Sequence, residues 1–268
     1  MRRTFLIDAA KAYKNEDSIG KGVARAIKEG IVKREELFII TKIWPTDYSR
    51  PEEVCKEQLK DLQVDYVDSY LIHWPWRIYD LEKKEHQKIP LYKLYAKLEA
   101  LLDKGLIKSI GLANFNVQST MDVLTYCIHK PVINQIEINP YFPQKELVKY
   151  CQSQGLAVIA YNSLVQGNWY SKNVKDFHKY DLFNEKIVTE LAKKYQKSSA
   201  QICLNWAICR NIAVIPKSSS LTRIKENLES SSFRLSKEDF ETLEEINYGV
   251  RFNSKEKYEF FGYFDVYA

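Results

Sequence analysis

The feature that most limits the fold of this chain is a regular alternation of two kinds of segment along its 268 residues. Short runs of β-branched and aromatic residues predict strands, and the longer amphipathic segments between them predict helices. The expected strands are Phe5–Ile7, Leu37–Thr41, Tyr66–Ile72, Ile107–Leu112, Val132–Ile136, Ala157–Ala160 and Ala213–Ile215. The expected helices include Ser18–Glu29, Pro51–Leu62, Leu91–Lys104 (which Gly105 should end), Gln144–Gln154 and Ser199–Cys209. This alternation predicts a parallel sheet with right-handed crossovers.

Two kinds of parallel fold fit the pattern, a doubly wound sheet and a (β/α)8 barrel. No Gly-x-Gly-x-x-Gly motif, the usual sign of a dinucleotide-binding doubly wound sheet, follows the first strand. Polar residues lie instead at the carboxyl ends of several strands, which is typical of a barrel with one active face. These residues are Asp8, Lys42, His73, Asn114, Gln135, Tyr161 and Lys217. We therefore expect a single α/β domain over residues 1–268, a (β/α)8 TIM-type barrel that is incomplete at the N-terminus because seven βα units are recognisable.

Composition excludes several classes of function. The chain has 45% hydrophobic and 28% charged residues, which is ordinary for a globular protein, and it lacks an apolar run long enough to cross a membrane. Its five cysteines form no Cys-x-x-Cys pair, which favours reduced thiols in a cytoplasmic protein and no metal site. The net charge of +5 is spread without a basic block, so no nucleic-acid partner is expected.

Four of the strand-end residues have a joint chemical use. Asp8 and Tyr13 follow the first expected strand, Lys42 the second and His73 the third. A lysine ammonium near a tyrosine lowers the pKa of the phenol, and an aspartate keeps the lysine charged and in place. The tyrosine then becomes a general acid for a carbonyl oxygen, which the histidine can hydrogen-bond and orient.

Each of these residues alone has an ordinary explanation. A strand-end lysine is usually a solvated charge, and a lone histidine is more often packed or capping. Tyr13 is one of 18 tyrosines. Only their joint occurrence, in order and each after a strand, favours an active site.

Six blocks of the sequence resemble the aldo-keto reductase family, in its aldose- and xylose-reductase-like branch, and they span nearly the whole chain. The blocks are IDAAKAYKNEDSIGKGV, VKREELFIITKIW, LQVDYVDSYLIHWP, KSIGLANFN, NQIEINPY and IPKSSSLTRIKEN. The resemblance implies that Asp8, Tyr13, Lys42 and His73 take the places of the catalytic tetrad, with Tyr13 as proton donor. Ala9 stands for the usual threonine and Lys14 for the usual glycine.

The resemblance also implies the cofactor NADPH or NADP+, bound without a Rossmann domain. Asn114 and Gln135 keep the amide side chains expected beside the nicotinamide, whereas Ala113 stands where a serine is common. Tyr161 matches the aromatic residue that stacks on the nicotinamide ring, and Leu164 lies in the same VIAYNSL segment.

The block IPKSSSLTRIKEN follows a strand and opens a helix. Hydroxyls, backbone N–H groups and cations at a helix N-terminus suit a phosphate dianion, although a capped surface helix explains the same pattern. With the resemblance, Lys217, Ser218 and Arg223 look like the clamp for the adenosine 2′-phosphate. The full set of residues assigned to this part of the cofactor site is Lys217, Ser218, Ser220, Arg223, Glu226 and Asn227.

The aromatic residues Trp44 and Trp74 are expected to line the substrate pocket, although both could be ordinary core residues. The tail Asn247–Ala268 resembles the loop that covers the pocket in the family. Family members also carry a capping hairpin, a first strand and a first helix before the Asp8 segment, so we expect the chain to be a truncated or divergent form.

Three functions remain open from the sequence. The first is NADPH-dependent reduction of a small-molecule aldehyde or ketone by a monomer or weak dimer. The second, motivated by the missing N-terminal unit and by Ala9, Lys14 and Ala113, is a cofactor-binding but catalytically silent or regulatory homologue. The third is an unrelated barrel lyase or phosphosugar enzyme that uses the IPKSSS block for substrate phosphate.

Overall fold

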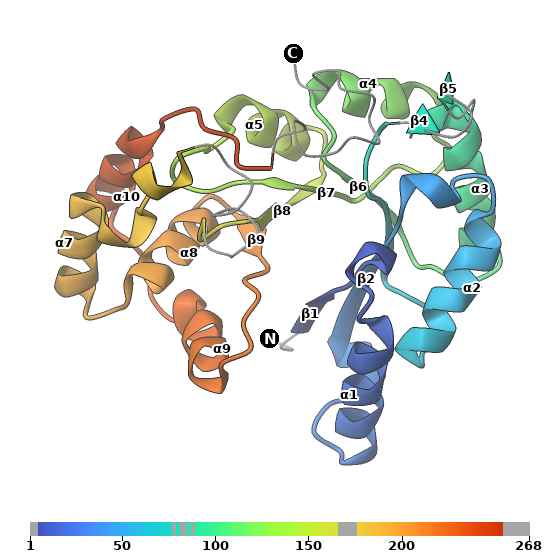
Figure 1. Ribbon diagram of the computed structural model, residues 1–268, viewed down its shortest axis with the longest axis horizontal. Coiled ribbons are helices and arrows are strands. Elements are labelled where there is room, and N and C mark those ends of the chain that lie inside the picture. The colour runs from blue at the N-terminus through green and yellow to red at the C-terminus, as the bar shows by residue number, and fades with distance from the viewer. Residues whose placement is uncertain (1–4, 77–78, 81–84, 87–88, 166–175, 254–268) are drawn as a thin grey trace. The chain divides into compact units, whose positions relative to one another are not determined.

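The computed structural model describes residues 5–76, 79–80, 85–86, 89–165 and 176–253 (Figure 1). The chain divides after Asn134 into two compact units, and each is described by itself. The prediction of a single domain over residues 1–268 stays a prediction, and residues 254–268 of the predicted tail lie outside the described residues. No helix in the described part of the chain is long and apolar enough to cross a membrane.

All the predicted strands and helices are present, with ends that differ by a few residues. The strands are β1 (Phe5–Asp8), β2 (Leu37–Ile43), β3 (Ser69–Ile72), β4 (Tyr79–Asp80), β5 (Glu85–His86), β6 (Ile110–Ala113), β7 (Ile133–Glu137), β8 (Ala157–Tyr161) and β9 (Ile212–Val214). The α-helices are α1 (Glu16–Lys28), α2 (Pro51–Leu62), α3 (Leu91–Asp103), α4 (Val117–Tyr126), α5 (Lys145–Ser153), α7 (Lys186–Tyr195), α8 (Ser199–Cys209), α9 (Leu221–Leu228) and α10 (Lys237–Leu243). The 3-10 turns are η1 (Lys11–Tyr13), η2 (Arg34–Glu36), η3 (Pro45–Asp47), η4 (Phe177–Lys179), η5 (Leu182–Asn184), η6 (Glu229–Ser231) and η7 (Glu244–Ile246). Gly105, at φ +69°, follows the end of α3 as predicted.

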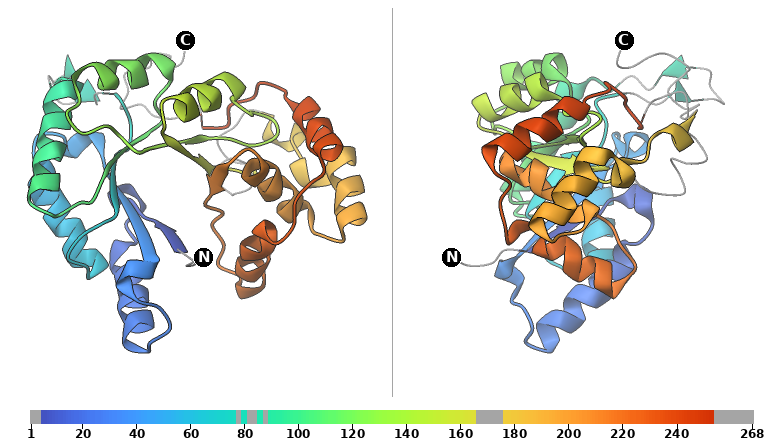
Figure 2. Two further views of the ribbon diagram at one scale, coloured as in Figure 1. Left: turned by 180° about the vertical axis from the view of Figure 1, so that it is seen from behind. Right: turned by 90° about the vertical axis from the view of Figure 1, so that its left-hand side faces the viewer.

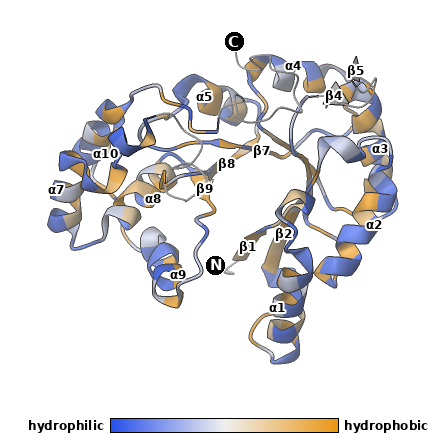
Figure 3. Cartoon of the chain, viewed as in Figure 1, coloured by the Kyte–Doolittle hydropathy of each residue, from blue (hydrophilic) through white to orange (hydrophobic). Residues whose placement is uncertain are grey.

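In the first unit, the strands lie in the order β1-β2-β3-β6, and each runs parallel to its neighbour. The hydropathy colouring shows β1 and β2 as largely hydrophobic segments (Figure 3). The register pairs Asp8 with Ile40 and Lys42 with Leu71, one residue before the end of β3. The carboxyl ends of the three strands therefore meet at one edge, where the residues after them lie close together.

The helices α1 and α2 pack against each other beside these strands, as the views from both sides show (Figures 1 and 2). Gly20 makes the close approach possible. A β-carbon added at Gly20 would lie 2.3 Å from the carbonyl oxygen of Asp61 and 2.8 Å from the Cα of Leu62. The spacing between α1 and α2 thus depends on the absence of a side chain at this position.

In the second unit, β7, β8 and β9 are neighbours in that order, and β8 and β9 run parallel. Helix α8 packs on α7 and β9, and it buries Trp206 completely. A capping box between Ser198 and Gln201 begins this helix. The short strand β9 leads through residues 215–220 to the N-terminus of α9.

Candidate active site

Lys42 is the centre of the site in the first unit. It lies near the end of β2 and is fully buried, yet its ammonium is well bonded. Nζ donates to the two carboxylate oxygens of Asp8 at 2.7 and 2.8 Å, to the carbonyl oxygen of Ala9 at 3.0 Å and to the hydroxyl of Tyr13 at 3.3 Å. A buried lysine is tolerated only when it is paired in this way. The structure therefore brings together three of the residues predicted for the tetrad.

Tyr13 comes to this ammonium through the η1 turn that follows β1. The turn ends at Lys14, which takes the left-handed conformation with φ +54° and ψ +36°. A β-carbon makes this conformation unfavourable, and glycine adopts it most easily. Tyr13 is 46% exposed as a whole residue, whereas its hydroxyl faces the buried ammonium of Lys42.

His73, the fourth predicted residue, follows β3 and lies beside Tyr13. Their ring centroids are 5.9 Å apart with the rings perpendicular. Trp44 contacts His73 edge-on at 4.9 Å, and Trp74 stacks parallel to it at 6.4 Å. The amide of Asn114 donates to the backbone oxygen of His73 at 2.9 Å, which fixes the strand end. Both tryptophans predicted for the pocket thus adjoin the histidine, Trp74 as a buried residue and Trp44 as a partly exposed one.

The electrostatics of the tetrad differ in one respect from the sequence-based expectation. Lys42 acts to lower the pKa of the Tyr13 phenol, as predicted, but burial of the hydroxyl is the larger cause and raises this pKa above its ordinary value. Burial opposes the charge on Lys42, and the Asp8 carboxylate overcomes it and raises the pKa of the ammonium. Tyr13 is therefore protonated and Lys42 charged at neutral pH.

Burial, assisted by the charge of Lys42, lowers the pKa of His73 well below its ordinary value. The imidazole is therefore neutral. Its Nδ1 atom is buried and bonds to no other residue in the described part of the chain. A neutral imidazole can donate one hydrogen bond and accept one, so this ring can orient a carbonyl oxygen without carrying a charge.

A surface ion cluster that the sequence did not indicate braces the turn that carries Tyr13. Lys11, in the η1 turn, pairs with Glu57 at 3.0 Å and with Asp47 at 3.6 Å. Arg50 bonds to the same two carboxylates at 3.0 Å each. The cluster links η1 to η3 and α2, although each exposed pair contributes little by itself.

Three of the residues predicted to lie beside the nicotinamide, Gln135, Tyr161 and Leu164, belong to the second unit. Gln135 is buried in β7, and Leu164 lies in the partly exposed turn after β8. Tyr161 ends β8, and its hydroxyl accepts a hydrogen bond of 2.8 Å from the amide of Asn253. This bond fixes the phenol end of Tyr161.

The segment between β9 and α9 has the chemistry of an anion site. The hydroxyl of Ser220 accepts from the backbone N–H of Arg223 and caps α9. The Ser218 hydroxyl accepts from the N–H of Ser220 at 3.1 Å. Lys217 and Arg223 are exposed, and neither forms an ion pair within the part of the chain that the structure describes. Two cations without an ion-pair partner among the described residues, next to a helix N-terminus, fit a phosphate, whereas the Ser220 cap already occupies the N–H of Arg223.

The two remaining predicted residues, Glu226 and Asn227, are partly exposed on α9. The backbone oxygen of Glu226 accepts from the amide of Gln201 at 3.1 Å, which ties α9 to α8. Among the described residues, no hydrogen bond or ion pair of either side chain distinguishes a ligand-binding role from a structural one.

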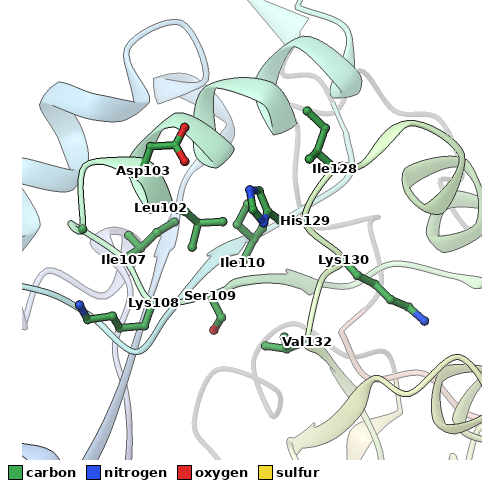
Figure 4. Close-up of a pocket in the computed structure, with 11 residues that line it drawn as sticks. Leu102, Asp103, Ile107, Lys108, Ser109, Ile110, Ile128, His129, Lys130 and Val132 are labelled. Atoms are coloured by element: carbon green, nitrogen blue, oxygen red, sulfur yellow. The ribbon is translucent and has the colours of Figure 1, made fainter.

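An open cavity of about 550 Å³ lies elsewhere in the first unit (Figure 4). It is lined by residues before and at the start of β6 and β7, among them Ile107, Ser109, Ile110 and Val132. These are the amino ends of the strands, whereas the tetrad follows their carboxyl ends. The cavity is therefore not the catalytic pocket. Among the described residues, no group of histidine, cysteine and carboxylate side chains could hold a metal ion.

Comparison with known proteins identifies the family. The model of the Aldo/keto reductase family matches residues 3–248. The chain belongs to the aldo-keto reductase family. It is 42% identical over 266 residues to a probable NAD(P)H-dependent D-xylose reductase of Aspergillus clavatus, with 92% of this chain and 80% of the relative covered. It is 38% identical over 272 residues to the 4-dihydromethyl-trisporate dehydrogenase of Mucor mucedo, with 95% and 85% covered.

Two solved aldo-keto reductases have the same fold. A Bombyx mori aldo-keto reductase in complex with NADP superposes with a TM-score of 0.84 at 33% identity, covering 95% of this chain and 82% of the other. The aldose reductase from Schistosoma japonicum gives a TM-score of 0.80 at 34% identity, with 92% and 80% covered. These neighbours are (β/α)8 barrels, so the predicted family and fold class are confirmed, with seven of the parallel strands among the described residues.

Proposed function

We propose that this aldo-keto reductase is an NADPH-dependent carbonyl reductase in which Tyr13 donates the proton. The observation that carries the proposal is the position of the Lys42 ammonium, which bonds to the Asp8 carboxylate and to the Tyr13 hydroxyl. This arrangement gives the phenol a neighbouring positive charge that is itself held in place.

The side chains have distinct roles in the reduction of an aldehyde or ketone. Tyr13 transfers its proton to the carbonyl oxygen as the carbon–oxygen double bond becomes a single bond. Lys42 stabilises the phenolate that remains, and Asp8 keeps Lys42 charged. The neutral His73 hydrogen-bonds the same oxygen and orients it. NADPH, when bound, supplies the hydride that the carbonyl carbon accepts.

The cofactor assignment rests on the chemistry of the β9–α9 segment. Lys217, Ser218 and Arg223 would bind the adenosine 2′-phosphate, which NADPH has and NADH lacks. Asn114, Gln135, Tyr161 and Leu164 would hold the nicotinamide end, as the family resemblance implies. The exposed cations Lys217 and Arg223, which have no ion-pair partner among the described residues, support this proposal, because they offer charge-assisted hydrogen bonds to an anion.

The substrate proposed is a small aldehyde or ketone, with Trp44 and Trp74 beside the reacting group. Relatives include a probable D-xylose reductase, so open-chain aldoses belong in the first panel of substrates together with aromatic aldehydes. Indole rings beside a carbonyl site accept both the carbon skeleton of a sugar and an aromatic ring.

The test compares Tyr13→Phe with the parent protein. Loss of the proton donor should lower carbonyl reduction at least about a hundredfold, whereas the dissociation constant for NADPH should stay unchanged. Tyr92→Phe is the matched control, because Tyr92 is a similarly exposed tyrosine in the same unit. The measurement is NADPH oxidation with the substrate panel, together with NADPH binding followed by tryptophan fluorescence.

The rival functions give different results in the same experiment. Binding of NADPH by the parent without turnover of any carbonyl would support the catalytically silent homologue. Failure to bind NADPH at all would favour a protein that uses the β9–α9 segment for another phosphate.

A further inference from the structure

A buried polar network lies directly behind Lys42, on the side of β2 away from the tetrad. Side chains alternate across a strand, so Thr41 and Lys42 point to opposite faces of the sheet. Thr41 is fully buried and donates a hydrogen bond to the carboxylate of Glu16, in the first turn of α1. Glu16 is only 5% exposed, and the tetrad makes no use of it.

Gln58, on α2, connects the members of this network. Its amide nitrogen donates to Glu16 at 2.9 Å, to the Thr41 hydroxyl at 2.7 Å and to the backbone oxygen of Lys42 at 3.2 Å. Its amide oxygen accepts from the hydroxyl of Tyr70, on β3, at 2.7 Å. The network thus joins residues of α1, α2, β2 and β3, and within it Gln58 is the residue that bonds to the backbone of Lys42.

Packing alone does not require such an arrangement. A buried carboxylate is costly, and apolar side chains of similar volume would fill the same space between sheet and helices at lower cost. Burial raises the pKa of Glu16, and hydrogen bonds from Thr41 and Gln58 oppose that effect. Hydrogen bonds depend on direction, whereas apolar contacts do not. A hydrogen-bonded network can therefore fix the orientation of the Lys42 peptide, which apolar packing would not do.

The position of the ammonium depends on this orientation. The Lys42 side chain begins at the peptide held by Gln58 and must reach Asp8 and Tyr13 at its other end. A small rotation of that peptide moves Nζ relative to the Tyr13 hydroxyl, and active-site groups lose much of their effect when displaced by about 1 Å.

We propose that Glu16, Gln58 and Tyr70 form a positioning network that holds the Lys42 ammonium against the Tyr13 hydroxyl. This proposal rests on the proposed function, which assigns Tyr13 as the proton donor. Neither the substrate nor the cofactor contacts Glu16, Gln58 or Tyr70 in that function. They act on catalysis through Lys42.

The main test uses Tyr70→Phe and Glu16→Gln, two changes that preserve side-chain shape. Tyr70→Phe leaves the amide oxygen of Gln58 without its donor and frees Gln58 to turn. We expect kcat to fall about three- to tenfold, with KM and the NADPH dissociation constant unchanged. Glu16→Gln keeps an acceptor for Thr41 and removes the charge, so kcat should fall about two- to threefold.

The controls remove the same groups from a different place in the same unit. Tyr95→Phe deletes a buried hydroxyl that donates to the backbone oxygen of His129 at 2.8 Å. Glu99→Gln alters a buried carboxylate that accepts from two backbone N–H groups at 2.7 Å each. Both should leave kcat within about twofold of the parent, because neither group touches Lys42.

A second measurement reports on Lys42 without any turnover. A buried, bonded ammonium exchanges slowly with water and gives a proton–nitrogen NMR signal, which Lys42→Met identifies by its disappearance. The signal should shift or broaden in Tyr70→Phe and Glu16→Gln and should remain unchanged in Tyr95→Phe and Glu99→Gln.

The outcomes separate the two proposals. If the parent reduces no carbonyl, the proposed function fails, and the NMR signal alone still decides whether the network holds Lys42. If kcat and the signal in the network variants match those of the controls, the network is structural only and the positioning proposal is overturned.

Discussion

The strand ends of β1, β2 and β3 and the segment between β9 and α9 carry the two halves of the proposed chemistry, and they are built in opposite ways. In the first region, the buried ammonium of Lys42 bonds to neighbouring protein groups. In the second, Lys217 and Arg223 are exposed, and no carboxylate in the described chain pairs with them. The region proposed for catalysis pairs its charges internally, whereas the region proposed for phosphate has two cations without a partner among the described residues.

This difference predicts how each region responds to change. Groups held by core packing and by one another are fixed before a ligand arrives, so their loss should affect stability and the rate of chemistry. Exposed cations at a helix N-terminus gain their partner only when an anion binds. Their loss should therefore change the affinity for that anion and the salt dependence of the affinity. The following experiments test this contrast, from the largest expected effect to the smallest.

Breaking the buried ion pair should have the largest effect. Lys42→Met leaves the Asp8 carboxylate without its cation in a site where only 10% of that side chain is exposed. We expect carbonyl reduction to fall by about three orders of magnitude, because the phenolate loses its stabilising charge, and the free energy of unfolding to fall by about 3–5 kcal/mol. Urea denaturation and NADPH oxidation measure the two effects.

The double variant Asp8→Asn/Lys42→Met is the control for this prediction. Removal of both charges should recover part of the lost stability without recovering activity. If Lys42→Met alone were as stable as the parent, the ion pair between Asp8 and Lys42 would not be effectively buried.

Removal of a cation from the β9–α9 segment should change affinity alone. Arg223→Ala should raise the dissociation constant for NADPH roughly ten- to a hundredfold and leave that for NADH unchanged, because only NADPH carries the 2′-phosphate. The turnover number at saturating NADPH should stay near that of the parent. Lys225→Ala, an exposed cation in the last turn of the same helix, should leave both constants unchanged. Equal losses for the two cofactors would contradict the assignment of this segment.

Acid should reveal the burial of His73. Its pKa is depressed in the folded protein, so the unfolded chain binds a proton more readily below pH of about 6.5, and stability should fall as the pH decreases. The slope due to this group is at most about 1.4 kcal/mol per pH unit. Unfolding free energies of the parent and of His73→Gln, measured from neutral to mildly acidic pH, isolate it. If the difference between the two proteins is independent of pH, the imidazole is not desolvated as described.

The smallest effect concerns the turn that presents Tyr13. Lys14→Gly relieves the left-handed conformation of a residue with a side chain, and it adds chain entropy to the unfolded state. The net gain in stability should be about 0.5–1 kcal/mol, seen as a higher midpoint of thermal unfolding. Lys14→Ala keeps the β-carbon and should give no gain. A gain of equal size in both variants would point to the lost charge instead of the backbone.

The proximity of Asp8, Tyr13, Lys42 and His73 could be predicted because they lie at or just after the carboxyl ends of three neighbouring parallel strands, which meet at one edge. The predicted bounds of the strands were less accurate. The prediction began the third strand at Tyr66, but β3 starts at Ser69, and just before it the carboxylate of Asp68 accepts from the backbone N–H of Ile39 at 2.9 Å. An aspartate after apolar residues gives no sign of which backbone group it will bind.

Other features depended on three-dimensional burial, which a sequence does not contain. The expected lowering of the Tyr13 pKa was wrong in its net direction, because desolvation of the hydroxyl outweighs the effect of Lys42. Glu16 and Gln58 have the pattern of ordinary polar positions on amphipathic helices, yet both are buried behind β2. Their partners come from four elements, so local spacing could not indicate them. The roles of the residues in the β9–α9 segment stay a prediction.

The close contact at Gly20 has a consequence for how mutations of this chain would be interpreted. Any side chain there would push α1 away from Asp61 and Leu62 on α2, and α1 begins with Glu16, three residues after Tyr13. A genetic screen for loss of enzyme activity would therefore recover substitutions at Gly20, a position with no functional group, and could mistake it for a ligand-binding residue. A variant library of this chain has to be scored for protein abundance as well as activity. Substitutions that disturb the spacing between helices are then distinguished from substitutions that remove a catalytic or binding group.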